Sequence, residues 1–454
     1  MSVSLNIAEQ VSFKKTKGTM ASIVFASSIG TIVEWYDFLI YGTAAALVFN
    51  ILFFPNVDSF TGMLASLATY AVGFFARPVG GVLFGHFGDR IGRKTMLMIT
   101  MTVMALGTFA VGLLPTYDQI GIWAPILLVT LRIIQGVALG GEWGGASLMV
   151  LEHAPSHRRG FYGSLVQVGF PLGLVTSYGV FALTTNLVSQ ADFISWGWRI
   201  PFLLSIGLLA VGWYVRARVP ETPLFEDIKR RGDIAQNPFL ETILKNPKTF
   251  MIAVGLKISE VSWVYILTIF AVVYGTTKLG LPRQTLLNAI FLAALAEVIS
   301  IPLFGWLSDI FGRRSFYFLG TLFTVCFAFP LFWLLDTKDP QIIAIAVIVA
   351  LSFGHGTMFG LQSAYFPELF GTRVRYTGAS FGFQIAAAIG GGLSLIIATA
   401  LADYMGGTAG VSVMLILLAA ITFVAALYAI RARNQECSAA LLVRRYSVLL
   451  GPNK

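Results

Sequence analysis

The chain is dominated by long apolar runs that short polar segments separate. A helix needs roughly 20 mostly apolar residues to cross a bilayer, and twelve runs reach that length. They cover residues 20–48, 60–85, 95–115, 122–150, 160–188, 198–216, 249–276, 284–309, 315–335, 341–365, 376–402 and 408–431. The pattern therefore predicts an all-α membrane protein with twelve transmembrane helices.

A long polar segment with four prolines, Arg216–Lys248, divides these spans into six and six. We expect an N-terminal six-helix bundle at 20–216, a cytoplasmic linker at 217–248 and a C-terminal six-helix bundle at 249–431. Residues 1–19 and 432–454 are expected to be cytoplasmic ends. The apolar run that follows residue 19 is too long for the core of a signal peptide, so it is expected to be an uncleaved first span.

Composition and charge agree with a membrane protein. Hydrophobic residues make up 56% of the chain and charged residues 12%, whereas about 25% of a soluble domain is charged. Of the 31 Lys and Arg, all but seven fall in segments on one side of the predicted membrane. The exceptions are Arg77, Arg132, Arg199 and Lys257 within spans and Lys278, Arg283 and Lys338 in external loops. This bias predicts cytoplasmic N- and C-termini, and it explains the net charge of +9 without nucleic acid.

One motif occurs twice. Residues 85–94 and 305–314 both fit G-x-x-x-D-x-x-G-R-[KR], 220 residues apart, after the second and the eighth span. Two halves with internal symmetry are typical of secondary transporters, in which the substrate binds near the membrane midplane between the halves.

The repeated motif resembles the signature loop of the major facilitator superfamily. Further strings are similar to its metabolite:proton symporter branch, with shikimate-type organic-acid transporters the most similar: Glu34-Trp-Tyr-Asp37-Phe, Arg132-Ile-Ile-Gln135-Gly, Gly141-Glu142-Trp-Gly-Gly-Ala, Ser195-Trp-Gly-Trp-Arg-Ile-Pro-Phe, Glu221-Thr-Pro-Leu-Phe, Lys257…Glu260, residues 277–283 and Pro367-Glu-Leu-Phe. The resemblance implies proton-coupled import of a small organic acid by alternating access. It also implies a multi-pass protein of the bacterial inner membrane that is active as a monomer. The expected partners are the substrate, protons and lipid, and no cofactor is expected.

Charged residues inside spans are rare and usually functional, because they are costly in the bilayer. Glu34 and Asp37 share one face of the first span, and we expect them to carry the coupled proton, with Asp37 favoured by the family motif. The alternative is that they anchor a neighbouring helix.

Substrate binding is expected at Arg132 and Gln135 in the fourth span and at Lys257 and Glu260 in the seventh. Arg132 could instead form a permanent ion pair with the first span, and Lys257 and Glu260 could neutralise each other. Tyr36 could stack on the substrate or simply pack. Glu297 and His355 are each the only mid-span charge or histidine of their helix, and a structural role is favoured for His355.

A cytoplasmic gate is expected at the repeated motif. In the family, such a cluster closes the inner side of the outward-facing state; the alternative is a set of solvated helix ends. The residues expected to form it are Gly85, Asp89, Arg90, Gly92, Arg93, Glu142, Arg159, Asp309 and Arg313.

Enzyme and metal chemistry have little support in the sequence. Residues 88–95 lack the Gly before Lys that a P-loop needs, and no H-E-x-x-H motif or nucleophile–base set is present. The two cysteines, Cys326 and Cys437, indicate neither a disulfide framework nor a zinc site. Two rival functions remain: a symporter for a compatible solute such as proline or betaine, and a non-transporting membrane receptor.

Overall fold

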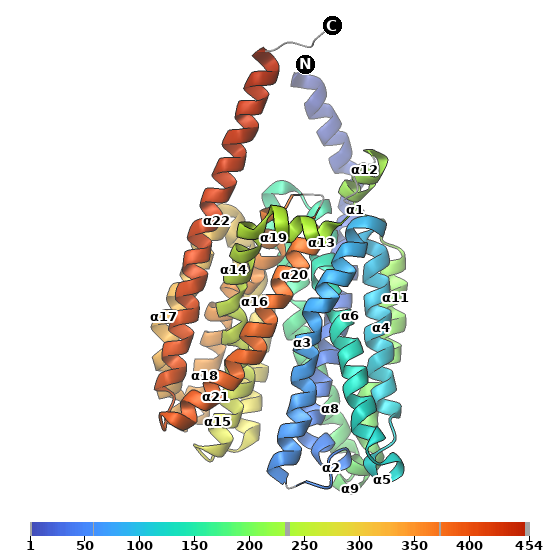
Figure 1. Cartoon of the computed structure of the whole chain (residues 1–454), viewed down its shortest axis with the longest axis vertical. Helices are drawn as coiled ribbons and strands as arrows, with labels where there is room; N and C mark the ends of the chain where they lie inside the picture. The colour runs from blue at the N-terminus through green and yellow to red at the C-terminus, as the bar shows by residue number, and fades with distance from the viewer. Residues whose placement is uncertain (1, 58, 232–236, 372–373, 450–454) are drawn as a thin grey trace.

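The protein folds as a bundle of long helices (Figure 1). The computed structural model describes residues 2–57, 59–231, 237–371 and 374–449, and every regular element in these ranges is helical. The predicted all-α class is therefore confirmed. The helices form two groups, and the segment of the chain that joins these groups carries the short helices α12 and α13.

The N-terminal group contains the first six predicted spans. Several of these spans are divided into consecutive shorter elements. The elements are α1 (Ser2–Ala44), η1 (Ala45–Phe49), α2 (Asn50–Leu52), α3 (Ser59–Ile91), α4 (Arg93–Leu113), α5 (Tyr117–Ile120), α6 (Trp123–His153), η2 (Ser156–Arg158), α7 (Arg159–Gln167), α8 (Gly169–Leu187), α9 (Gln190–Asp192), η3 (Phe193–Gly197), α10 (Arg199–Leu203) and α11 (Ser205–Ala217).

The linker and the C-terminal group complete the chain. Three of the later spans contain a π-helical turn (η5, η6 and η7), a feature often found at functional sites. The elements are α12 (Pro223–Arg231), α13 (Pro238–Leu240), η4 (Glu241–Lys245), α14 (Pro247–Tyr265), η5 (Ile266–Phe270), α15 (Ala271–Thr277), α16 (Arg283–Phe311), α17 (Arg313–Asp336), α18 (Pro340–Val349), η6 (Ala350–His355), α19 (Gly356–Leu369), α20 (Arg375–Ala387), η7 (Ala388–Leu393), α21 (Ser394–Tyr404) and α22 (Ala409–Leu449).

Eleven stretches of the described residues are long and apolar enough to cross a membrane, and each overlaps one predicted span. The predicted second span, 60–85, is not among them, although α3 covers it with 33 residues. Arg77 lies in the middle of α3. The helix packs against α6 on one side and α20 on the other, so protein surrounds its polar residues.

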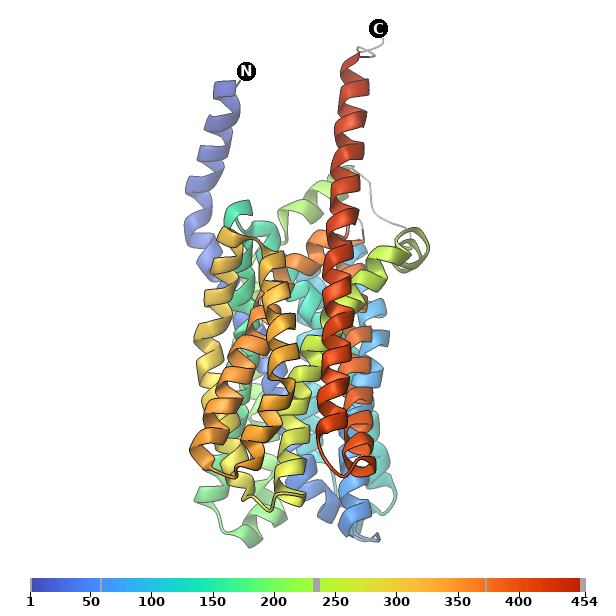
Figure 2. The same cartoon turned by 90° about the vertical axis from the view of Figure 1, so that its left-hand side faces the viewer.

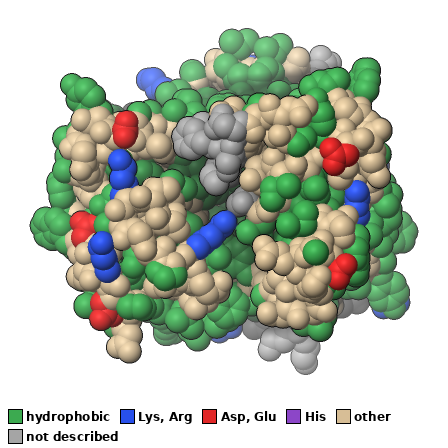
Figure 3. Space-filling view, turned by 90° about the horizontal axis from the view of Figure 1, so that it is seen from below, with side chains coloured by type: hydrophobic (Ala, Val, Ile, Leu, Met, Phe, Trp, Pro, Cys, Tyr) green, Lys and Arg blue, Asp and Glu red, His purple; other side chains and the backbone are tan. Residues whose placement is uncertain are grey.

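Both ends of the described chain lie at the same end of the bundle as α12 and α13 (Figures 1 and 2). We call this end the linker end. An even number of crossings returns the chain to the side on which it began, as the twelve predicted spans require. That this side is cytoplasmic stays a prediction from the Lys and Arg distribution. Viewed from the opposite end, the surface carries scattered charged side chains of both signs (Figure 3).

The two groups pack against each other through α3 and α6 with α20, and through α7 and α8 with α16. Within the N-terminal group, glycines allow α3 and α6 to approach closely. A side chain at Gly80 would overlap the Val137 carbonyl, and one at Gly140 would overlap the Arg77 carbonyl. This close crossing fixes the positions of Arg77 on α3 and Arg132 on α6, which both point into the bundle.

Candidate functional site

Two buried guanidinium groups lie on one aromatic ring in the N-terminal group. Arg132 is 0% exposed and Arg77 is 3% exposed. Their guanidinium carbons lie 4.3 and 4.1 Å from the centre of the Phe38 ring. Tyr41 and Tyr70 complete an aromatic cage around Arg132, at 4.3 and 4.9 Å. Aromatic faces stabilise a cation without neutralising its charge.

Neither guanidinium has an ion pair with a carboxylate among the described residues. Nε and Nη2 of both arginines are buried without a hydrogen-bond partner. Nη1 of Arg132 lies 3.5 Å from the Gln135 side-chain oxygen, and Gln135 in turn donates to Thr108 at 2.8 Å. The permanent ion pair between Arg132 and the first span is therefore not formed. Buried charges are normally paired, so this arrangement is suited to an anion from outside the chain.

Asp37 is fully buried in the same group, and both of its carboxyl oxygens lack a hydrogen-bond partner. Thr108 is near enough to interact with it, but the Thr108 hydroxyl donates to the Met104 carbonyl at 3.0 Å. An ionised carboxylate without a donor is expensive in such surroundings. The geometry is therefore that of a carboxyl group able to take up a proton, rather than that of a helix anchor.

Glu34 and Glu142 line one small cavity together with Asp37. Glu142 forms an ion pair with Arg216 of α11 and accepts a hydrogen bond from Thr100 at 2.5 Å. We expected Glu142 in the cytoplasmic gate, but these partners hold it inside the N-terminal group, where it faces Glu34 instead. Its partners lie on α4 and α11, a relation that spacing along one helix does not reveal.

Tyr36 does not join the substrate candidates. It is 1% exposed, and its hydroxyl donates to the Pro201 carbonyl at 2.8 Å. This bond ties α1 to α10, so the structure favours the packing alternative for Tyr36.

Lys257 and Glu260 do pair with each other, at 2.5 Å between Nζ and Oε2. They are not isolated, however, because Gln362 of α19 bridges them: it accepts from Lys257 at 2.9 Å and donates to Glu260 at 2.8 Å. His355 then joins Glu260 to Glu297. His355 and Glu297 are each the only mid-span charge or histidine of their helix, and the packing of η6 on α16 brings them together.

At the linker end, Asp89 connects the two groups. Its carboxylate accepts hydrogen bonds from the backbone N–H of Tyr376 and of Thr377, at 3.3 and 3.0 Å, and from the Thr377 hydroxyl at 2.9 Å. These donors form the first turn of α20, where a negative charge is stabilised. Gly85, one turn earlier, lies against Thr377, and a side chain there would come within 2.8 Å of the Thr377 Cα.

Asp309, the equivalent residue of the second motif, makes the equivalent contact in the other direction. It accepts from the backbone N–H of Gly160 and of Phe161, both at 2.8 Å, in the first turn of α7. Each motif thus binds the start of a helix in the opposite group, and the two aspartates connect the groups at the linker end.

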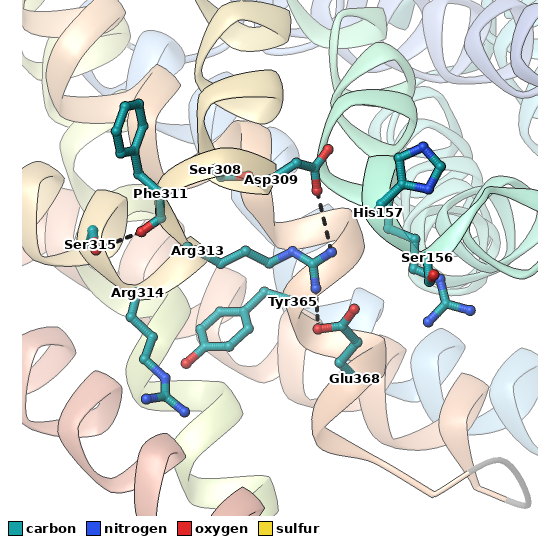
Figure 4. A pocket seen from close by; sticks show the side chains of 12 residues that line it. Ser156, His157, Ser308, Asp309, Phe311, Arg313, Arg314, Ser315, Tyr365 and Glu368 are labelled. Atoms are coloured by element: carbon teal, nitrogen blue, oxygen red, sulfur yellow. Dashed lines mark hydrogen bonds and ion pairs between the residues drawn. The ribbon is translucent and has the colours of Figure 1, made fainter.

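Arginines of the two motifs form ion pairs beside these contacts. Arg93 pairs with Glu152 at 3.3 Å, and Arg375 of the opposite group approaches the same oxygen at 4.0 Å. Arg313 reaches between Asp309 and Glu368 (Figure 4). Asp309, Arg313 and Glu368 line a linker-end cavity of about 580 Å³, together with residues of η2 and α7.

The remaining gate candidates lie beside these hydrogen bonds and ion pairs. Gly92 has a φ of +128°, a value that favours glycine, and it leaves room for the Glu221 carboxylate, which accepts from the Arg93 N–H at 3.2 Å. Arg90 is exposed and lies 3.3 Å from His86 on its own helix. Arg159 also lines the cavity.

The chain was compared with known families and proteins. A family model described as Major Facilitator Superfamily matches residues 18–392. The chain belongs to the major facilitator superfamily. Members are membrane transporters, so this chain is a transporter and not an enzyme.

Individual proteins support this membership. This superfamily member is 44% identical to the shikimate transporter of Escherichia coli strain K12, over 87% of this chain and 92% of that one. It is 38% identical to the inner membrane metabolite transport protein YhjE of the same organism, over 91% and 95%. The structure of the proton:xylose symporter XylE of E. coli superimposes with a TM-score of 0.72 at 16% identity, covering 91% of this chain and 95% of XylE. XylE shows the shared fold.

Three groups of functional candidates escaped the sequence analysis. Arg77 was noticed as a charge within a span, but its partnership with Arg132 depends on the crossing of α3 and α6. Glu152 and Glu368 are each followed by an arginine seven positions later (Arg159 and Arg375). That second repeat could have revealed the acidic partners of the gate arginines. The contact between His355 and Glu297 could not be predicted, because neither helix has a sequence pattern that indicates it.

Proposed function

We propose that this protein is a proton-coupled symporter that imports a small organic acid, either shikimate-like or resembling 2-oxoglutarate or citrate. The single observation that carries the proposal is the pair of buried guanidinium groups, Arg77 and Arg132, without carboxylate partners. Arginine binds carboxylates in a planar two-pronged geometry, so a substrate carboxylate is the natural counter-ion. The 44% identity to a shikimate transporter supports the same class.

Binding and coupling are assigned to both groups of helices. Arg132, with Gln135 beside it, receives the substrate carboxylate, and Lys257 with Glu260 contacts the substrate from the C-terminal group. Asp37, with Glu34 nearby, takes up the proton on the outer side and releases it on the inner side. The unpartnered Asp37 carboxyl group supports this role.

Alternating access follows from rocking of the bundle 20–216 against the bundle 249–431, with residues 217–248 as the cytoplasmic linker between them. Asp89, Arg93, Asp309 and Arg313 hold the cytoplasmic side closed until substrate and proton are bound. We place the protein in the bacterial inner membrane as a monomer that spans it several times, in keeping with the name of its relative YhjE and with the eleven apolar stretches.

The compatible-solute alternative fits the buried charges less well. A betaine or proline carries its own positive charge, which two neighbouring guanidinium groups would repel. The receptor alternative predicts binding of the same ligand without accumulation.

Ligand binding by purified protein tests the proposed substrate class. Shikimate, 2-oxoglutarate, citrate and betaine should be titrated and followed by the intrinsic fluorescence of the nine tryptophans. Arg132→Gln should abolish binding of the preferred acid, while Lys278→Gln, an exposed residue at the opposite end, should leave it unchanged. Binding of betaine in preference to every acid would refute the organic-acid proposal.

A further inference from the structure

A chain of four ionisable side chains is buried in the C-terminal group, and the proposed cycle uses only half of it. It runs from Lys257 through Glu260 and His355 to Glu297, and the side chains are at most 3% exposed. We call these four residues the C-bundle network. Its members come from α14, η6 and α16.

Hydrogen-bond counting points to an extra proton in the C-bundle network. His355 Nε2 lies 2.8 Å from Glu260 Oε1, and Nδ1 lies 2.5 Å from Glu297 Oε1. A neutral imidazole has one N–H donor and one acceptor nitrogen, while an ionised carboxylate can only accept. Both contacts can therefore be hydrogen bonds only if the imidazole carries two protons or if a carboxyl group carries one.

Charge counting gives the same result. With Lys257 protonated, both glutamates ionised and His355 neutral, the buried network would carry a net charge of −1. One added proton, on His355 or on Glu297, makes it neutral. Burial of an uncompensated charge is costly, and the second oxygen of Glu297 has no hydrogen-bond partner. The site of the added proton is thus the contact between His355 and Glu297.

Among the described residues, His355 makes hydrogen bonds or ion pairs only with Glu260 and Glu297, so no other side chain takes the place of this proton in the two contacts. Tyr317 of α17 and Tyr265 of α14 lie within electrostatic range of Glu260, and Arg77 of α3 lies within range of Lys257. The tyrosines are neutral at physiological pH. His355 is packed between Phe359, at 4.5 Å, and Phe170 of the N-terminal group, at 5.3 Å. The proton site therefore borders the surface along which the two groups move.

We propose that His355 and Glu297 form a second proton site, and that its proton determines whether Lys257 can bind a substrate carboxylate. When the proton is present, His355 and Gln362 both satisfy Glu260, and Lys257 is available to a substrate carboxylate. When it leaves as H⁺, His355 becomes a neutral donor to one carboxylate only, the network carries −1, and Lys257 is needed to neutralise Glu260. A substrate anion would then enter a site that is already negative.

The inference rests on the proposed symport, but its test has one part that does not. Glu297→Gln keeps the shape of a protonated carboxyl group and can donate to His355 permanently. His355→Gln removes the bridge, and Lys278→Gln, at an exposed position of the opposite end, is the control.

The first part of the test compares two forms of transport in proteoliposomes with labelled shikimate. Exchange of internal for external substrate at equal pH needs no net movement of protons. Glu297→Gln should keep exchange and lose accumulation driven by an inward proton gradient. One coupled proton supports about tenfold accumulation per pH unit, so the variant should stay near equal concentrations while the control matches the wild type. Equal loss of exchange and accumulation in Glu297→Gln would indicate a merely structural role and overturn the proposal.

The second part needs no substrate. Infrared difference spectra and ¹⁵N resonances of the four histidines should be recorded for purified protein at mildly acidic and at alkaline pH. At the acidic pH we expect either a protonated carboxyl band that Glu297→Gln removes or a doubly protonated ring that His355→Gln removes. Absence of both would overturn the second proton site whatever the protein transports. Failure of wild-type shikimate transport with either spectral feature present would refute the proposed substrate alone.

Discussion

Replacement of Asp89 by Asn is expected to open the linker end. Asp89 is 4% exposed and accepts three hydrogen bonds from the first turn of α20, at 2.9 to 3.3 Å. Asn keeps one acceptor oxygen, brings an NH₂ group toward backbone N–H groups, and lacks the negative charge that a helix N-terminus stabilises.

The magnitude follows from these contacts. A hydrogen bond to a charged group contributes about 1.5–3 kcal/mol and a neutral one about 1 kcal/mol. Loss of the charge together with one contact should destabilise the closed linker end by about 2 kcal/mol, which is about a 30-fold change in the ratio of closed to open molecules.

Distances between two spin labels measure this ratio. Labels on cysteines at Arg158 and Ser315, in a background with Cys326 and Cys437 replaced by Ser, report on the two groups separately. Both positions are exposed; Arg158 is in η2, next to residues that line the linker-end cavity, and Ser315 lines this cavity from α17. Double electron–electron resonance should show a new, longer distance in Asp89→Asn that is minor in the wild type.

Two further variants complete this experiment. Asp309→Asn should shift the distances in the same direction, since Asp309 makes the equivalent contact to α7. Asp403→Asn, at an exposed pair with Lys278 at the opposite end, should change nothing. Identical distance distributions for Asp89→Asn and the wild type would refute the view that Asp89 holds the two groups together.

Three other predictions concern binding and stability. Arg132→Lys should weaken binding of the preferred acid about tenfold or more in the fluorescence titration, because one charge-assisted hydrogen bond is worth about 1.5–3 kcal/mol; unchanged affinity would remove Arg132 from the site. Gly80→Ala should lower the thermal unfolding temperature in detergent because it forces α3 from α6, whereas Gly179→Ala, in open space, should not; equal melting of both would contradict the close crossing. Arg216→Gln should cost about 3–5 kcal/mol by stranding buried Glu142, and Glu142→Gln in the same chain should restore part of this loss; no recovery would show that the pair is not the cause.

Much of the fold could be predicted from hydropathy alone. The bilayer demands helices of a minimum length, so apolar runs predict spans with little influence from tertiary contacts. The second predicted span is also one long helix, α3. The repeat of Asp89 at Asp309 predicted a gate at the motif, and in the structure each aspartate accepts hydrogen bonds from the first turn of a helix in the opposite group.

The partners of the buried charges could not be predicted in this way. Glu142 stands on the same helix as Arg132, yet its partners are on α4 and α11. His355 and Glu297 are 58 positions apart in the sequence, and nothing within η6 or α16 indicates that they meet. An ion pair between neighbours of one helix, such as Lys257 with Glu260, is local and was considered in advance. A pair between helices depends on how those helices pack.

The most direct test of the account is uptake of labelled shikimate by purified protein in liposomes under an inward proton gradient. We expect accumulation above the external concentration, abolished by an uncoupler, absent in Arg132→Gln and retained in Lys278→Gln. No uptake of shikimate, 2-oxoglutarate or citrate by folded protein, or accumulation that the uncoupler leaves unchanged, would contradict proton-coupled import of an organic acid.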